Sequence, residues 1–87
     1  MKIQVKFRND SGEEVLATFD RDAGTVSTQD GRKGTYSRPD GSRTMEIKGD
    51  DNLTMTFADD VRFEPGFSTR YTTSDGRAGV ATILAVG

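Results

Sequence analysis

Apolar residues recur at every second position along most of this chain. Residues 3–7 place Ile, Val and Phe between Gln and Lys, and residues 53–57 place Leu, Met and Phe between threonines. Such alternation is typical of a strand that buries one face and exposes the other to water. No window of useful length has the 3.6-residue period of an amphipathic helix, so the sequence predicts an all-β fold.

Turn-forming residues separate the alternating segments about every 8–12 residues, which is the spacing of an antiparallel sandwich or barrel. Asp-Gly pairs at 30–31, 40–41 and 75–76 predict tight hairpins, because glycine accepts the positive φ that primed turns require. Eight strands are expected, with the seventh interrupted by Glu-Pro-Gly as a bulge, a corner or a full turn. They cover residues 3–7, 14–19, 25–29, 34–38, 44–48, 53–57, 61–73 and 80–86.

Strands of this length nearly exhaust the 87 residues, so the whole chain, 1–87, is expected to form one domain. We predict a small antiparallel meander of about eight strands that closes, or nearly closes, into a β-barrel, because closure removes exposed strand edges. The first strand then pairs with the last. A two-sheet β-sandwich is the alternative architecture.

The last segment, residues 80–86, is almost continuously apolar. Because a strand of this kind buries both faces, we expect it to be covered on both sides or to have its outer face covered by a partner. A dimer formed through this C-terminal strand is therefore one of the expected possibilities. The small core is expected to leave no room for a large internal ligand cavity.

Several kinds of chemistry are excluded by residue types that the chain lacks. Histidine and cysteine are both absent, which removes the commonest general base, the thiolate nucleophile and the usual transition-metal ligands. The lysines fall at expected solvent-facing positions or in turns, where burial does not lower an amine pKa. No glycine motif has the strand–loop–helix context of a phosphate site. We therefore predict no enzyme, no catalytic residue and no cofactor.

Aspartates gather at the expected strand junctions, at 20 and 22, at 50 and 51, and at 59 and 60. Aspartate is favoured there because its side chain accepts hydrogen bonds from the neighbouring backbone. The segment 20–24 begins like a calcium loop, but glycines stand at its fifth and twelfth positions where oxygen ligands are required. We predict solvated turn residues and no metal site.

One segment combines aromatic residues with arginine beside a Pro-Gly break, and both residue types are frequent in protein-interface hot spots. The sequence therefore predicts a non-enzymatic binding module that acts by protein–protein contact, as an inhibitor or accessory subunit of a larger partner. Compact phage or mobile-element inhibitors are one form of such a protein. The alternative is that these aromatic residues fill the core at a corner. The expected contact residues are Arg62, Phe63, Phe67, Arg70 and Tyr71.

The alternative function is binding of single-stranded nucleic acid, because small barrels also bind such strands through basic and aromatic faces. The net charge of −2 and an isoelectric point near 5.0 argue against it, since nucleic-acid domains are usually basic. The residues that would carry this function are Arg32, Lys33, Tyr36, Arg38 and Arg43.

We expect a cytoplasmic protein, because the chain opens on a strand pattern in place of the charged and apolar regions of a signal peptide. The alternative is an exported protein whose signal peptide has been removed, since a chain without cysteine is compatible with the cytoplasm and with an oxidising compartment. No stretch approaches the roughly 20 apolar residues of a membrane helix, so no membrane partner is expected.

Overall fold

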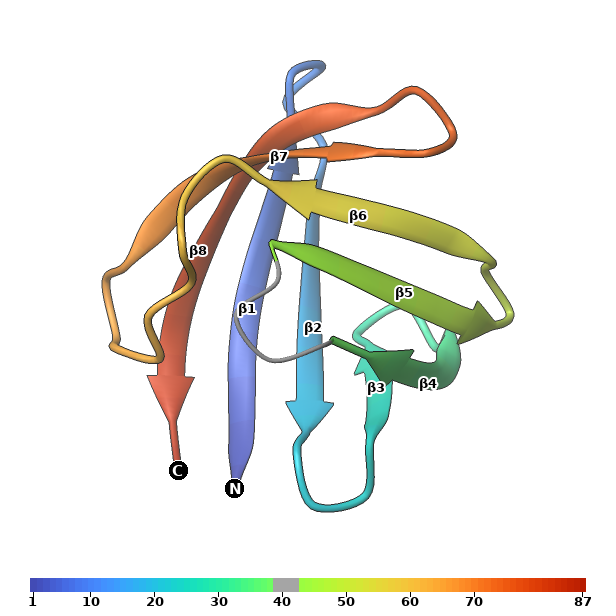
Figure 1. The fold of residues 1–87 in the computed structure, drawn as a ribbon, viewed down its shortest axis with the longest axis vertical. Helices are drawn as coiled ribbons and strands as arrows, with labels where there is room; N and C mark the ends of the chain where they lie inside the picture. Colours follow the sequence, from blue (N-terminus) through green and yellow to red (C-terminus); the bar gives the residue numbers. More distant parts are fainter. Residues whose placement is uncertain (39–42) are drawn as a thin grey trace.

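The computed structural model describes residues 1–38 and 43–87, and these residues form a closed antiparallel β-barrel without a helix (Figure 1). The predicted all-β barrel is confirmed. The Asp-Gly pair at 40–41 lies outside the described residues. The eight strands of the described part are β1 (Lys2–Asn9), β2 (Glu14–Asp20), β3 (Thr25–Thr28), β4 (Lys33–Ser37), β5 (Thr44–Gly49), β6 (Leu53–Phe57), β7 (Ser68–Thr73) and β8 (Ala78–Val86).

Each strand pairs with the next one in sequence, and β8 returns to pair with β1. The register places Ile3 opposite Phe19 on β2, and Phe7 opposite Ala81 on β8, so apolar positions of neighbouring strands coincide. Figure 1 shows β1 and β8 side by side, with both chain ends at one end of the barrel. The expected pairing of the first strand with the last is therefore present.

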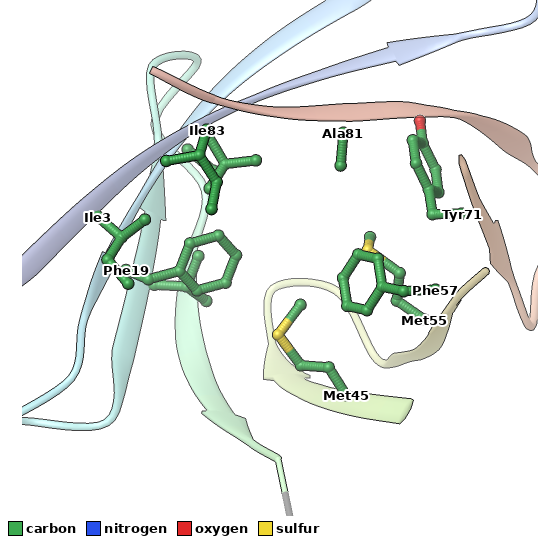
Figure 2. Close-up of a cluster of buried hydrophobic side chains, with 11 residues drawn as sticks. Ile3, Phe19, Met45, Met55, Phe57, Tyr71, Ala81 and Ile83 are labelled. Atoms are coloured by element: carbon green, nitrogen blue, oxygen red, sulfur yellow. The ribbon is translucent and has the colours of Figure 1, made fainter. Parts of the chain in front are cut away.

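The barrel interior is filled by the apolar members of the alternating strands (Figure 2). Phe7 meets Tyr71 edge-on with ring centroids 5.4 Å apart, and it meets Phe19 at 6.2 Å. Phe19 in turn meets Tyr36 at 5.1 Å, which extends the row of aromatic contacts to β4. The buried core consists of Ile3, Val5, Ala17, Phe19, Val26, Met45, Met55, Phe57, Tyr71, Ala81 and Ile83.

A bulge accounts for the continuous apolar run of β8. Val5 pairs with Ile83 and Gln4 pairs with Ala85, so Leu84 is an extra residue without a partner on β1. Ile83 is buried, whereas Leu84 is 43% exposed on the outside of the barrel. In the described part of the chain the outer face of β8 is therefore uncovered at Leu84, and a partner that covers this face stays a prediction. The run is continuously apolar because the bulge shifts by one residue which positions of the strand face the barrel interior.

The expected strand at residues 61–63 is wrong, because residues 58–67 form a loop between β6 and β7. The backbone carbonyl of Glu64 accepts a hydrogen bond from the backbone N–H of Phe67 at 3.1 Å, and Gly66 between them has a φ of 92°. With Pro65 before that glycine, this is a type II turn. Of the three predicted possibilities for Glu-Pro-Gly, a bulge, a corner or a full turn, the structure has the full turn. Val61 and Phe63 pack against the core from the loop and do not extend the sheet.

The described Asp-Gly turns differ from the two-residue primed hairpins that their sequence suggests. Gly31 and Gly76 have φ values of 93° and 91°, but no other residue type in the described part has a positive φ. Primed type I turns need positive φ at both central residues, so this type is absent from both turns. In the first of them, the backbone N–H of Thr28 donates to the carbonyl of Arg32 around a three-residue loop that ends in Gly31. Glycine in the left-handed region then supplies the bulge that such loops require.

Candidate functional site

A recess opens at each end of the barrel among the described residues, and Phe7 and Phe19 line both of them. The recess at the end of the β1–β2, β3–β4 and β7–β8 turns has a volume of about 120 Å³, and we call it the hairpin-end recess. The other, of about 100 Å³, lies under the loop 58–67, and we call it the Phe63 recess. Both are smaller than the roughly 300–1,000 Å³ of a typical small-molecule pocket.

The charged rim of the hairpin-end recess is occupied by its own ion pairs. The Nη1 atom of Arg32 lies 2.8 Å from Asp51 Oδ2, and its Nε atom lies 3.1 Å from Asp30 Oδ2. On the opposite hairpin the Nε atom of Arg77 lies 3.2 Å from Asp75. The hydrogen bond from Arg32 to Asp30 raises the pKa of that guanidinium. These arginines therefore have carboxylate partners within the chain, which leaves little charge for a ligand.

The Phe63 recess is mostly apolar, and the loop 58–67 forms one side of it. In Figure 1 this loop, coloured yellow to orange, runs from β6 toward the end of the barrel where the termini lie. The loop is tied to β7 at its start, because Thr69 Oγ1 accepts the N–H of Asp59 and donates to the carboxylate of Asp59. The recess is lined by Ile3, Val5, Phe7, Phe19, Arg21, Tyr36, Arg38, Met45, Phe57, Val61, Phe63, Phe67, Thr69, Ala81 and Ile83.

Two guanidinium groups lie beside the half-buried ring of Phe63. The Cζ atom of Arg21 is 4.4 Å from the ring centroid, and that of Arg38 is 5.6 Å from it. A cation at this distance is attracted by the negative face of the ring. Arg21 belongs to the β2–β3 turn, and its backbone N–H donates to the carbonyl of Met1 at 3.0 Å. The Phe63 recess thus combines an apolar interior with a positively charged lip.

Tyr36 adds a phenol to the wall of the Phe63 recess. It stands on β4, where its backbone N–H donates to the carbonyl of Gly24 at 3.0 Å. Burial of the side chain raises the pKa of Tyr36 above its ordinary value. The hydroxyl group therefore stays protonated at neutral pH and can donate a hydrogen bond.

The five residues expected to contact a protein partner lie in different places. Phe63 and Phe67 are half-buried and line the Phe63 recess together. Tyr71 is only 5% exposed, inside the barrel, so it fills the core as the alternative interpretation had it. Arg70 points outward from the neighbouring position and lies 3.0 Å from Asp10, and Arg62 is exposed in the loop.

The five residues of the nucleic-acid alternative also lack a common surface. Arg32 and Lys33 lie at the hairpin end, whereas Tyr36 and Arg38 line the Phe63 recess at the other end. Arg43 lies 3.0 Å from Asp60 and donates to the Ala58 carbonyl. No single face of the described barrel carries all five residues, which are Arg32, Lys33, Tyr36, Arg38 and Arg43.

The aspartates at the strand junctions mainly serve the backbone and nearby cations. Asp20 Oδ1 accepts the N–H groups of Asp22 and Ala23 at 3.1 and 3.2 Å, which is the capping role expected of turn aspartates. Asp50 accepts the N–H of Lys33 at 2.9 Å. Within residues 1–38 and 43–87, no three side chains of the metal-ligating types are grouped to hold an ion.

Sequence reasoning missed the contribution of Arg21 and Val61 to the Phe63 recess. Arg21 stands in a turn between two aspartates, a pattern that suggests only a solvated corner. Its contact with Phe63 depends on how the loop 58–67 folds over the barrel end, which no local pattern encodes. The apolar character of Val61 indicated a buried position, but its alternation with Phe63 favoured a strand over a loop.

Comparison of the chain with protein-family models, with curated proteins and with solved structures found no match. In the part of the chain that the structure describes, no helix has the length and apolar character needed to cross a membrane.

Proposed function

We propose that this chain is a non-catalytic binding module that receives an aliphatic side chain of a protein partner in the Phe63 recess. The observation that supports this function is the combination of an apolar interior with Phe63 and two guanidinium groups at its lip. Protein interfaces favour such an arrangement, with an apolar anchor in a pocket and arginine and aromatic residues around it.

The size of the recess favours a small apolar group. An apolar cavity of about 150 Å³ admits benzene, so a recess of about 100 Å³ suits a branched aliphatic side chain better than a large aromatic one. Water in such a site finds few hydrogen-bond partners on the walls. Its replacement by an aliphatic group therefore favours binding.

A binding role without catalysis accords with the residue types at the recess. Its ionisable side chains are those of Arg21, Arg38 and Tyr36, and burial raises the pKa of Tyr36, so its hydroxyl group keeps the proton near neutral pH. A general base near pH 7 is normally a histidine, a carboxylate or a lysine with a lowered pKa, and none lines the described recess. The Phe63 recess can therefore hold and orient a group but offers no side chain to take a proton from it.

The test uses a short uncharged peptide with a C-terminal leucine amide and a matched peptide with alanine amide. We expect the leucine peptide to shift the methyl resonances of Val5, Val61 and Ile83, which line the recess, and the alanine peptide to shift them much less. Isotope-labelled protein and NMR titration give the affected residues and the affinity together. Shifts confined to Val15 or Leu53, at the hairpin-end recess, contradict the proposal.

Matched variants separate the two ends of the barrel. Phe63→Ala removes the lip of the Phe63 recess and is expected to weaken leucine-peptide binding about 10-fold, the loss of about 1.4 kcal/mol that an interface anchor commonly contributes. Leu53→Ala truncates a half-buried side chain of the hairpin-end recess and is expected to leave binding unchanged. Equal binding by both variants contradicts the proposed site.

A further inference from the structure

We propose that the Phe63 recess recognises the free C-terminus of a partner chain that ends in an aliphatic residue. The side chain enters the recess, and the terminal carboxylate pairs with the guanidinium group of Arg21. This inference rests on the function proposed above and specifies the chemistry of the partner.

Arg21 is exposed, and its guanidinium group lies beside the ring of Phe63. A guanidinium that lies near an aromatic ring uses its flat face for that contact, while its N–H groups point outward in the plane. Those N–H groups match the two oxygens of a carboxylate in a bidentate pair. With its Cζ atom 4.4 Å from the ring centroid, Arg21 can keep the contact with Phe63 and bind an anion together.

The charges around Arg21 also favour an external anion. In the described part of the chain, no carboxylate lies within ion-pair distance of Arg21, whereas Arg32 and Arg77 at the other end both have such partners. The aspartates that flank Arg21 have hydrogen-bond partners of their own, although Asp22 also attracts Arg21 electrostatically. Asp20 accepts two backbone N–H groups, and Asp22 lies 2.7 Å from the amino group of Met1.

The short distance between the apolar and the charged parts of the site favours a terminal residue. Phe63 lines the recess, and the Arg21 guanidinium is 4.4 Å from the centre of its ring. A ligand must therefore carry its carboxylate only a few atoms from its aliphatic group. In a C-terminal leucine, isoleucine or valine both groups are attached to the same Cα. The site thus favours a chain end over an acidic side chain elsewhere in a partner.

The experiment compares three ligands of the same aliphatic group by isothermal titration calorimetry. They are a short peptide with a C-terminal leucine acid, the same peptide as the leucine amide, and 4-methylpentanoate, a free acid that lacks a peptide chain. We expect the peptide acid to bind at least about 10-fold more tightly than the amide, since hydrogen bonds to a charged group contribute roughly 1.5–3 kcal/mol. We expect 4-methylpentanoate to bind more weakly than the peptide acid.

Charge-neutral variants assign the difference to particular side chains. Arg21→Gln is expected to remove most of the preference for the acid, so that the variant binds the acid and the amide with about the same affinity. Arg77→Gln at the hairpin end removes the same charge from the chain and is expected to preserve the preference. Thermal unfolding of both variants checks that each is folded.

The outcomes distinguish this inference from the function on which it rests. Equal affinity for acid and amide overturns the carboxylate site and leaves the aliphatic recess standing. If neither leucine peptide binds, the proposed function fails together with the inference. If 4-methylpentanoate binds as tightly as the peptide acid, the site is one for small aliphatic acids, and recognition of a chain end is overturned.

Discussion

A methyl group on Gly79 would lie 2.1 Å from the carbonyl oxygen of Arg8, far closer than a Cβ atom comes to a neighbouring backbone atom. Gly79 pairs with Asn9 on β1 and with Tyr71 on β7, so three strands pass one another at this point. The atoms nearest to the added methyl group all belong to the backbone, and they cannot rotate away as a side chain can. The seam that closes the barrel therefore depends on a glycine at this position.

Gly79→Ala is expected to lower the free energy of unfolding by about 3 kcal/mol, because strands β1 and β8 must move apart to accept the methyl group. Urea denaturation measures the change. Gly87→Ala is the control, since no atom lies within 4 Å of its added methyl group, and we expect a change within about 0.5 kcal/mol. Equal stability of the two variants contradicts this account of the seam.

Phe19→Ala removes one of the two inner rings of the four-membered aromatic row; this ring is 6% exposed and meets both Phe7 and Tyr36 edge-on. We expect a loss of about 3–5 kcal/mol in the free energy of unfolding, as for other buried phenylalanines. Leu84→Ala is the comparison, because Leu84 is 43% exposed outside the barrel and is expected to change stability by less than about 0.5 kcal/mol. A large, concentration-dependent loss for Leu84→Ala would instead show that this face is covered by another chain.

Much of the barrel could be predicted from the sequence because the period of two decides which face of each strand is buried. The alternation placed Ile3, Val5 and Ala17 on the inside, and all three are core residues. Two of the differences from the prediction arose where a residue leaves the sheet geometry. Leu84 sits in a bulge, and Val61 packs inward from a loop, so an alternating or apolar pattern there has a different cause.

The candidate site was less predictable because it depends on contacts between segments that are far apart in the chain. Phe63 and Phe67 were identified from composition, but their charged neighbour Arg21 lies beyond the reach of any local pattern. The alternation in β7 already places Arg70 and Tyr71 on opposite faces, which the structure bears out. That signal was sufficient to separate those two residues into a surface position and a core position.

The turns at Thr28 and Thr73 repeat one hydrogen-bond pattern. In the first, the backbone N–H of Arg32 donates to Thr28 Oγ1 at 3.0 Å, and the threonine hydroxyl donates to Asp30. In the second, Thr73 has the same two kinds of partner at the same positions along the turn. The threonine hydroxyl thus links the start and the end of each loop.

Thr28→Val keeps the shape of the side chain and removes both hydrogen bonds, so we expect it to destabilise the barrel by about 1 kcal/mol. Thr73→Val is expected to cost a similar amount in the second turn. Thr28→Ser retains the hydroxyl and serves as the control, with a smaller change. Denaturant unfolding of the three variants gives the comparison, and a valine variant as stable as the serine variant contradicts a role for the hydroxyl.

The same turns make the stability of the fold depend on pH. The hydrogen bond from Thr28 lowers the pKa of Asp30, with a further contribution from Arg32, and the hydrogen bond from Thr73 lowers the pKa of Asp75. A carboxyl group whose pKa is lower in the folded than in the unfolded chain favours folding when it is ionised. Its contribution is complete above the unfolded pKa of about 3.9 and is lost as the pH falls through the folded value.

We therefore expect the urea midpoint to be constant near neutral pH and to fall as the solution is acidified below about pH 4, where the unfolded chain takes up protons first. NMR titration of the carboxyl carbons should place the midpoints of Asp30 and Asp75 below the ordinary aspartate value. In Thr28→Val, the Asp30 midpoint should rise toward that value while the Asp75 midpoint stays where it was. A titration of Asp30 that is the same in the variant and the unmodified chain would show that the threonine hydroxyl is not the cause.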